Sequence, residues 1–363
     1  MMNTKRYTRQ MILPHVGLSG QQALNASKVL LVGAGGLGLP CAQSLVAAGV
    51  GQITIIDDDR VSLSNLHRQY LFNEADVGRY KVEALHDRLS GQNSDVRISY
   101  IRERLNMSNA PDLIAAHDLV IDGSDNFATK FLINDTCLIK KIPWIYGSVS
   151  RFEGQLAVFS SKPSKQHSCY RCLYEKMPTS KIENCAEQGV FGAVTGIIGN
   201  YQALEALKIL IEINSNKKDS TLKLLNSKTD ILHIFDFQTM EQQSLFISKR
   251  TTCICEKPEL IQLKDEDSAV CFVEAEKSWN AFVRDENIKI LFDVRSQEEF
   301  QAGHHKLGQF WGPDTMQKLI HTEFTRSESI YLYCATGKRA REKCFELREK
   351  GIFAYHINEH FEL

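Results

Sequence analysis

One glycine-rich segment constrains the fold of this 363-residue chain more than any other feature. It covers residues 33–38, directly after a short apolar run and directly before a helical pattern, and contains Gly33, Gly35, Gly36 and Gly38. Glycines there let the backbone approach phosphates, and the start of the helix offers unpaired N–H groups and a favourable dipole. Asp57 ends the next apolar run, where a carboxylate accepts hydrogen bonds from ribose hydroxyls. The segment predicts a nucleotide site, and taken alone it fits a nicotinamide-dependent oxidoreductase equally well.

Short apolar runs alternate with helical patterns through the first half of the chain, which predicts a mostly parallel sheet flanked by helices. The expected strands are Lys28–Val32, Gln52–Ile56, Val96–Ile101, Leu119–Asp122 and Trp144–Gly147, and the expected helices are Leu37–Ala48, Lys81–Leu89 and Ala128–Lys140. Strand patterns return at Gly154–Ser160 and Thr221–Phe237. We therefore expect an α/β, Rossmann-like sheet with an antiparallel extension.

The composition changes near residues 256–267, where charged residues and a proline replace the apolar patterns. We expect a linker there, between a first domain at 1–255 and a second at 268–363. Within the second domain, Ile288–Asp293 and Ser329–Tyr333 have strand patterns and Ala340–Lys350 has a helical one. The chain is long enough for two cores, and the second is predicted to be a small α/β domain.

Charge and hydropathy argue against a nucleic-acid binder and against an exported or membrane-spanning protein. The formal net charge of -1 argues against a nucleic-acid binder, which needs an excess of Lys and Arg to neutralise phosphates. The polar, basic first ten residues do not resemble a signal peptide. The most apolar later stretch, Val194–Ile213, is interrupted by polar residues and predicts a largely buried helix instead of a membrane span. We expect a cytoplasmic protein.

Charged motifs follow the glycine segment, and together they favour a nucleoside triphosphate over a dinucleotide as the ligand. Residues 64–69 (SNLHRQ) are followed by Lys81, and residues 122–126 (DGSDN) lie at the carboxyl end of an expected strand. Ligands collect at that edge of open α/β sheets. A lone Lys or Arg is usually solvated surface, but two cations and a carboxylate together suit a triphosphate with Mg²⁺ better than a dinucleotide.

Taken in this order, residues 4–255 resemble the MoeB/ThiF family of ubiquitin-activating-like enzymes. The resemblance begins at residues 6–10 (RYTRQ) and continues through the glycine segment and both charged motifs. It implies a homodimer that uses ATP to adenylylate the C-terminal glycine of a ubiquitin-like sulfur-carrier protein with a Gly-Gly tail. The carrier would be MoaD-like, for molybdenum-cofactor biosynthesis, or ThiS-like, for thiamine biosynthesis.

The resemblance also implies a role for individual residues. The glycines would line the nucleotide and Asp57 would bind its ribose; the residues at the phosphates and their Mg²⁺ would be Ser64, Asn65, Arg68, Lys81, Asp125 and Asn126, with Asp125 on the metal. Arg9 would act across the dimer interface. A carboxylate is already ionised at neutral pH, so its attack on the α-phosphate needs aligned positive charge and no general base.

The ten cysteines are expected to serve metal or thiol chemistry where they cluster, because nothing in the sequence suggests export to an oxidising compartment. Cys169 and Cys172 form a C-x-x-C pair, and Cys253 and Cys255 a C-x-C pair where the family has C-x-x-C. Four thiolates from two short segments suit a structural Zn²⁺; reduced structural thiols are the alternative. The family places a carrier-bonding cysteine where this chain has Cys185, whose other interpretation is an inert loop thiol.

The second domain contains two motifs that resemble rhodanese domains. Residues 291–295 (LFDVR), followed by Glu299 and His304, are similar to the rhodanese entry motif, although the usual proline after it is missing. Cys334 lies between a strand and a helix, with Arg339 close behind. Loop N–H groups, the helix dipole and nearby cations lower the pKa of such a thiol, which favours a persulfide carrier. The alternative is a catalytically idle rhodanese fold.

The two halves together predict adenylylation of the carrier followed by sulfur transfer from a Cys334 persulfide, with a sulfur donor such as a cysteine desulfurase. Two other hypotheses remain open from the sequence. One is activation of a different ubiquitin-like modifier for conjugation or cysteine biosynthesis. The other is a non-catalytic scaffold that binds the carrier.

Overall fold

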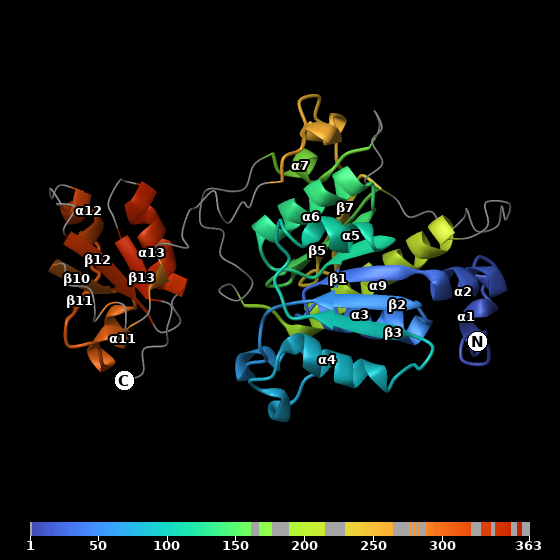
Figure 1. Cartoon of the computed structure of the whole chain (residues 1–363), viewed down its shortest axis with the longest axis horizontal. Helices are drawn as coiled ribbons and strands as arrows, with labels where there is room; N and C mark the ends of the chain where they lie inside the picture. The colour runs from blue at the N-terminus through green and yellow to red at the C-terminus, as the bar shows by residue number, and fades with distance from the viewer. Residues whose placement is uncertain are drawn as a thin grey trace. The chain divides into compact units, whose positions relative to one another are not determined.

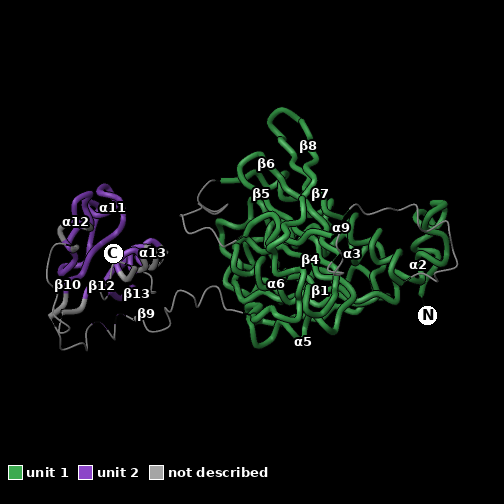
Figure 2. Tube along the Cα trace, turned by 90° about the horizontal axis from the view of Figure 1, so that it is seen from above, with its two compact units in different colours: residues 1–266 green, residues 267–363 purple. Residues whose placement is uncertain are grey.

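The computed structural model describes residues 2–160, 167–175, 189–214, 229–263, 276–277, 279, 282, 288–320, 328–334, 338–349 and 354–357. The chain divides into two compact units, Met1–Glu266 and Asp267–Leu363 (Figure 2). In the segment expected as a linker, Pro258 is buried and Ile261 packs against the core of unit 1. Unit 1 therefore extends beyond its two cysteine pairs.

Unit 1 is built on an eight-stranded sheet in the order β3-β2-β1-β4-β5-β6-β7-β8 (Figure 1). Its strands are β1 Lys28–Val32, β2 Gln52–Ile56, β3 Arg97–Ile101, β4 Leu119–Asp122, β5 Trp144–Ser150, β6 Glu153–Phe159, β7 Ile231–Asp236 and β8 Glu241–Phe246. The pairs from β3 through β5 are parallel, and those from β5 to β8 are antiparallel. The predicted fold class is confirmed. Of the expected strand Thr221–Phe237, residues 221–228 lie outside the described residues.

Helices cover both faces of this sheet because neighbouring strand residues point to opposite sides. In β1, Val29 and Leu31 join one apolar cluster while Leu30 and Val32 join another. The first face carries α2 Gly17–Ala26, α3 Gly38–Ala48, α4 Lys81–Ser90 and α9 Gly192–Asn214, and the second carries α5 Ala110–Ala115, α6 Phe127–Lys140 and α7 Tyr170–Leu173. A short helix, α1 Thr8–Met11, precedes them.

Helix α9 differs in part from its prediction as a largely buried helix. Ile198 and Leu210 are fully buried, whereas Ile197, Tyr201 and Leu204 are exposed. One side of the helix therefore packs on the sheet and the other presents apolar side chains. No described helix has both the length and the apolar character of a membrane span.

Unit 2 contains a five-stranded parallel sheet in the order β11-β10-β12-β13-β9. Its strands are β9 Glu276–Lys277, β10 Ile288–Asp293, β11 Gly308–Phe310, β12 Glu328–Tyr333 and β13 Ala354–Ile357, and its described helices include α11 Gln297–Ala302, α12 Thr315–Ile320 and α13 Lys338–Glu349. Apolar clusters form on both faces, one around Phe292 and Leu332 and the other around Phe282 and Tyr331. This is the small α/β domain that the sequence predicts.

Candidate functional site

The two loops that carry the predicted site meet at the point where the strand order of unit 1 reverses. Strands β1 and β4 are neighbours, and the chain continues from β1 to β2 on one side and from β4 to β5 on the other. The loop after β1 contacts the loop after β4 so closely that a Cβ on Gly33 would lie 2.7 Å from the carbonyl oxygen of Gly123. Gly33 also has φ +97°, which favours glycine. Open α/β sheets bind ligands at such a switch point.

The glycines of the loop differ in how much space a side chain would have at each position. A Cβ on Gly38 would lie 2.0 Å from the carbonyl oxygen of Gly33, so close packing of the loop against helix α3 excludes a side chain there. A Cβ on Gly36 would meet Thr195 of α9 at 3.1 Å. A Cβ on Gly35 would approach no atom more closely than 4.0 Å. Packing does not require a glycine at Gly35, whereas close approach of a phosphate to the backbone would.

Asp57 lies at the end of β2 and is held by two backbone N–H groups. Ala34 donates to its Oδ2 and Asp59 to its Oδ1, both at 2.7 Å. Burial raises the pKa of the Asp57 carboxyl, and the nearby Lys81 ammonium opposes that effect. The carboxylate thus has a fixed orientation beside the glycine loop, as a ribose-binding residue needs.

The predicted phosphate-binding residues lie in and after the turn that follows β2. The Lys81 side chain is 7% exposed, and its Nζ pairs with Oδ2 of Asp59 at 2.6 Å. Arg68 donates from Nη1 to the carbonyl oxygen of Ser64 at 3.1 Å, and Oδ1 of Asn65 accepts from a backbone N–H in the same turn. A Cβ on Gly192 would lie 2.3 Å from the carbonyl oxygen of His67, so the start of α9 packs against this motif.

The motif after β4 combines an exposed acid with a buried ion pair. Asp125 is exposed, and Oδ1 of Asn126 accepts from the backbone N–H of Thr129 at 2.9 Å, which caps helix α6. Sequence reasoning missed Lys130, whose buried Nζ lies 2.5 Å from Oδ2 of Asp122. Its signal in the sequence is a lysine four residues after the capping asparagine, inside an otherwise apolar stretch of helix.

The described contacts do not join Arg9 to this switch point, and a second predicted site residue lies outside the described part of the chain. Helix α1, which carries the exposed Arg9, packs through Gln10 on the carbonyl oxygen of Ala48, at the far end of α3. Because α3 has 11 residues, that end lies about 16 Å from the glycine loop. Cys185 lies outside the described residues.

The four cysteines of the two pairs converge into one cluster. Their Sγ atoms lie within 4.8 Å of one another. Neighbouring Sγ atoms are separated by 3.9 Å (Cys169 and Cys172), 3.6 Å (Cys169 and Cys253) and 3.7 Å (Cys172 and Cys255). Zn–S bonds of about 2.3 Å in a tetrahedron place sulfurs about 3.8 Å apart. The donor set therefore fits Zn²⁺, and the shortened C-x-C spacing does not prevent it because a 3₁₀ turn at Ile254–Glu256 brings both thiols inward.

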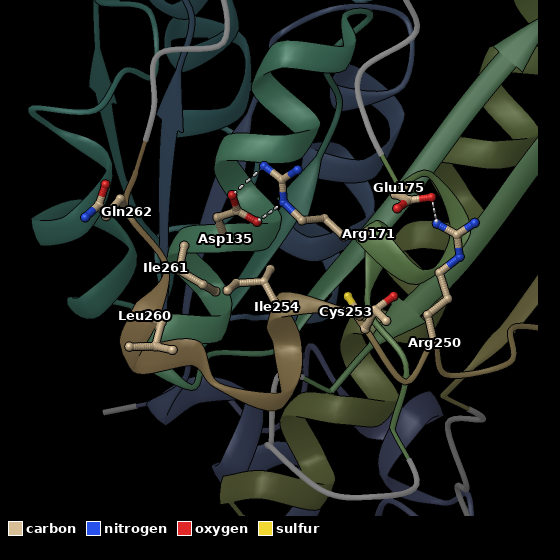
Figure 3. A pocket seen from close by; sticks show the side chains of 10 residues that line it. Asp135, Arg171, Glu175, Arg250, Cys253, Ile254, Leu260, Ile261 and Gln262 are labelled. Atoms are coloured by element: carbon tan, nitrogen blue, oxygen red, sulfur yellow. Dashed lines mark hydrogen bonds and ion pairs between the residues drawn. The ribbon is translucent and has the colours of Figure 1, made fainter.

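A cavity lies beside this cluster (Figure 3). Its lining includes Cys253 and two arginines that are both paired with carboxylates. Arg171 binds Asp135 through two hydrogen bonds of 2.8 and 2.7 Å, and Arg250 lies 2.8 Å from Glu175. These pairs neutralise the cavity wall, which gives it no clear preference for an anionic ligand.

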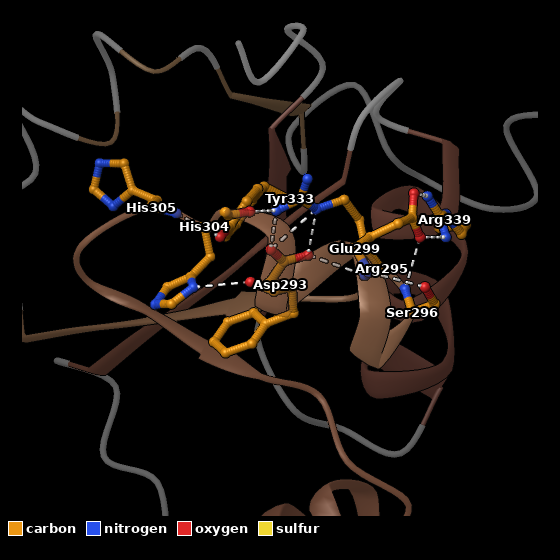
Figure 4. Close-up of polar contacts among 10 residues, drawn as sticks. Asp293, Arg295, Ser296, Glu299, His304, His305, Tyr333 and Arg339 are labelled. Carbon is orange, nitrogen blue, oxygen red and sulfur yellow. Dashed lines mark hydrogen bonds and ion pairs between the residues drawn. The ribbon is translucent and has the colours of Figure 1, made fainter. Parts of the chain in front are cut away.

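In unit 2, a network of ion pairs surrounds the carboxyl ends of β10 and β12 (Figure 4). The buried carboxylate of Asp293 binds Arg295, whose Nη2 also donates to the carbonyl oxygen of Gly303 at 2.6 Å. Arg339 pairs with Glu299 at 2.6 and 2.8 Å, and this guanidinium lowers the pKa of the Glu299 carboxyl to about 2. Cys334 follows β12 directly and is buried. Residues 335–337 of its loop lie outside the described residues.

The topological switch point, its glycine loop and its fixed carboxylate define unit 1 as a nucleotide-binding α/β protein. Residues 7–248 match the model of the ThiF family. The chain belongs to this family, which confirms the resemblance seen in the sequence.

Individual relatives extend the match beyond unit 1. The sulfur carrier protein adenylyltransferase of Thermus thermophilus is 45% identical over 211 residues, which cover 57% of this chain and 78% of that protein. Two proteins named adenylyltransferase and sulfurtransferase MOCS3 match more of the chain. The one from Drosophila willistoni is 38% identical over 82% of this chain and 66% of its own length. The one from Caenorhabditis briggsae is 38% identical over 83% of this chain and 72% of its own length.

Solved structures show the same fold at lower identity. E. coli MccB in complex with ATP superposes with a TM-score of 0.57 at 21% identity, over 70% of this chain and 75% of that one. MccB with MccA-N7isoASN gives a TM-score of 0.58 at 20% identity, over 71% and 76%. Both support the fold of unit 1 and nothing finer.

Proposed function

We propose that this chain uses ATP to adenylylate the C-terminal glycine of a ubiquitin-like sulfur-carrier protein and then transfers sulfur to it from Cys334. The observation that carries the proposal is the topological switch point, where the open Gly35, the fixed Asp57 and the exposed Asp125 lie on the loops after neighbouring strands. The names of the relatives, adenylyltransferase for both and sulfurtransferase for MOCS3, support each half of the reaction.

In the first step an oxygen of the carrier's terminal carboxylate attacks the α-phosphorus of ATP. The bond from that phosphorus to the bridging oxygen of the β-phosphate breaks, and pyrophosphate leaves. Arg68 and Lys81 bind the phosphates, and the ribose hydroxyls donate to Asp57. Asp125 holds Mg²⁺, which neutralises part of the triphosphate charge. These residues align the carboxylate with the α-phosphate and stabilise the negative charge of the transition state. No general base is needed, because the nucleophile is already ionised.

In the second step the outer sulfur of a Cys334 persulfide attacks the activated carbonyl carbon and AMP leaves. Two thiol groups of a reductant then cleave the sulfur–sulfur bond and are oxidised to a disulfide, which leaves a thiocarboxylate on the carrier and restores the Cys334 thiol. Arg339, which lies close to Cys334, supports the negative charge of the persulfide. A persulfide donor must reload Cys334 for each turnover.

Zn²⁺ in the cluster of Cys169, Cys172, Cys253 and Cys255 has a structural role in this proposal. Four thiolates leave no open coordination position, and such closed sites stabilise folding without taking part in catalysis.

The active enzyme is a homodimer in which Arg9 completes the site of the partner. Arg9 is exposed at the far end of α3 from its own glycine loop, and α9 presents apolar side chains at Ile197, Tyr201 and Leu204. Mixing Arg9→Ala with Asp125→Ala protein tests this arrangement. Exchange restored by mixing two inactive variants requires Arg9 to act in trans, and no restoration contradicts it.

Carrier-dependent ATP–pyrophosphate exchange tests the first step. A MoaD-type and a ThiS-type carrier are compared with wild-type enzyme and with Asp125→Ala. Exchange with one carrier that is lost in Asp125→Ala supports adenylylation and identifies the pathway. No exchange with either carrier would contradict the proposal and favour another ubiquitin-like partner or a non-catalytic scaffold. Mass spectrometry of the carrier then distinguishes a thiocarboxylate from a conjugate.

A further inference from the structure

The buried ammonium of Lys130 connects strand β4, the loop that follows it and strand β5. Its Nζ donates to Oδ2 of Asp122 at 2.5 Å, to the carbonyl oxygen of Ser124 at 2.9 Å and to that of Gly147 at 3.1 Å. The side chain of Lys130 is 6% exposed and that of Asp122 is 0% exposed. All three donors of the ammonium are therefore used inside the protein.

The partners of Lys130 lie on both sides of one short loop. Asp122 is the last residue of β4, and Gly147 belongs to the adjacent strand β5. The other carboxylate oxygen of Asp122 accepts from the backbone N–H of Ser124 at 3.0 Å and from its hydroxyl at 2.5 Å. Ser124 is thus held by both members of the ion pair, and the next residue is the exposed Asp125.

Helix α9 adds a further anchor to the same loop. Nε2 of the buried Gln202 donates to the carbonyl oxygen of Asp122 at 2.7 Å. Because α9 also contacts Gly36 through Thr195, one helix supports both the loop after β1 and the loop after β4. The backbone leading to Asp125 is therefore fixed from β4, β5, α6 and α9, while the Asp125 side chain stays accessible.

Stability alone does not explain a buried ion pair at this place. Well-packed apolar side chains of similar volume are often as stabilising as a buried Lys–Asp pair, or more so, because both charges lose their hydration. What an apolar pair cannot supply is a set of directed hydrogen bonds to the backbone. Here those bonds end on the residue that precedes Asp125.

We infer that Lys130 is a positioning residue: with Asp122 it fixes the backbone at Ser124 so that the Asp125 carboxylate can bind the Mg²⁺ of bound ATP. The inference rests on the proposed function and deepens it. Lys130 touches neither the nucleotide nor the carrier in this role. Its loss changes metal binding at Asp125 and leaves the glycine loop and Asp57 in place to bind ATP.

The test uses the full chain with Lys130→Met and Asp122→Asn combined. Lys130→Met alone would leave the Asp122 carboxylate buried without a partner, which can unfold a protein, whereas the double variant has no lone buried charge. Lys130→Arg is a second variant that keeps the charge but has a planar group unable to reproduce the three bonds of the ammonium. Lys140→Met, at the far end of the same helix, is the matched control.

Two measurements separate positioning from folding. The first is the rise in melting temperature caused by ATP, with Mg²⁺ and with EDTA, because a ligand that binds only the folded state raises it. The second is the Mg²⁺ dependence of carrier-dependent exchange. For the double variant we expect the rise with ATP and EDTA to be kept and the additional rise from Mg²⁺ to be lost. Exchange should fall by about 10²-fold, comparable to the loss of one preorganised catalytic group, with Lys130→Arg intermediate and Lys140→Met unchanged.

The outcomes distinguish this role from the proposed function. A double variant with a wild-type response to Mg²⁺ in both measurements overturns the role of Lys130 alone. If the double variant does not fold, a wild-type response of Lys130→Arg overturns it instead. If the wild-type enzyme shows no exchange with either carrier, the proposed function itself is contradicted, whatever the melting temperatures of the variants.

Discussion

The backbone N–H of Ala34 donates a 2.7 Å hydrogen bond to Oδ2 of Asp57, which joins the glycine loop after β1 to the end of β2. The other carboxylate oxygen accepts from the backbone N–H of Asp59. Each oxygen of a carboxylate has two acceptor sites, so both can still accept a hydroxyl. The carboxylate that we propose to bind the ribose is therefore oriented before a nucleotide arrives.

Asp57→Asn should weaken ATP binding by about 10- to 100-fold, because a hydrogen bond to a charged group is worth about 1.5–3 kcal/mol. The amide NH₂ of the asparagine would also face one of the two backbone N–H groups that donate to the carboxylate, so that hydrogen bond would be lost. Isothermal titration calorimetry measures the change, with Asp58→Asn at the exposed neighbouring position as the control. Equal affinity of Asp57→Asn and wild type would contradict the assigned ribose contact.

Two glycine variants should fail in different ways. Gly35→Ala adds a methyl group that comes no closer than 4.0 Å to any atom beyond its chain neighbours, so the melting temperature should stay within about 2 °C of wild type while ATP binding is lost. Gly38→Ala places its methyl group against the carbonyl oxygen of Gly33 and should destabilise the fold itself. Thermal melting with and without ATP separates the two. ATP binding by Gly35→Ala at wild-type affinity would mean that phosphates do not approach this loop.

Continuous apolar runs with polar ends made several strands predictable from the sequence. Lys28–Val32, Gln52–Ile56, Leu119–Asp122 and Ile288–Asp293 begin and end as expected. Each lies between two neighbouring strands of its sheet, so both of its faces are covered and most of its residues are apolar until the strand ends. The glycine loop and Asp57 follow from these strands, because the topology places the ends of β1 and β2 side by side.

Features that depend on tertiary contacts could not be predicted in the same way. Strand β8 (EQQSLF) is exposed at every position and lies at the sheet edge, so it has no apolar pattern. Helix α9 is apolar on nearly all sides, and only its neighbours determine which side is buried. From the sequence alone Lys130 is indistinguishable from a surface lysine, because its partner, Asp122, comes from a strand end eight residues earlier. A buried ion pair is identified by geometry and not by residue type.

The Glu299–Arg339 pair predicts a pH dependence for unit 2. Arg339 lowers the pKa of the Glu299 carboxyl from 4.5 to about 2, so its contribution is present above pH 4.5 and is lost as the pH falls toward 2. The free-energy difference between wild type and Glu299→Gln should therefore be constant from pH 7 to 5 and shrink below 4.5. Urea unfolding in a Trp144→Phe background, which leaves Trp279 and Trp311 as reporters, measures it. Glu298→Gln, at the exposed neighbour, should show no such trend, and a difference that stays constant down to pH 3 would contradict the pair.

The cysteine cluster predicts one zinc ion per chain, measurable by metal analysis of the purified protein. Cys172→Ala should lose this zinc, because its Sγ lies 3.9 Å from that of Cys169 and 3.7 Å from that of Cys255, in the middle of the cluster. Cys137→Ala, a buried cysteine of helix α6 outside the cluster, is the matched control and should keep its zinc.

Loss of this metal should affect stability more than chemistry. Binding of structural zinc by four thiolates contributes about 10 kcal/mol or more to folding of the segments it joins, and here it joins α7 to the turn at Cys253–Cys255. A chelator should therefore lower the melting temperature of wild type and of Cys137→Ala but have little further effect on Cys172→Ala. Below the new melting temperature, ATP binding should persist, since the described contacts around Asp57 and Gly35 involve none of the four cysteines. Zinc-free wild-type protein with an unchanged melting temperature would show that the thiols pack without a metal.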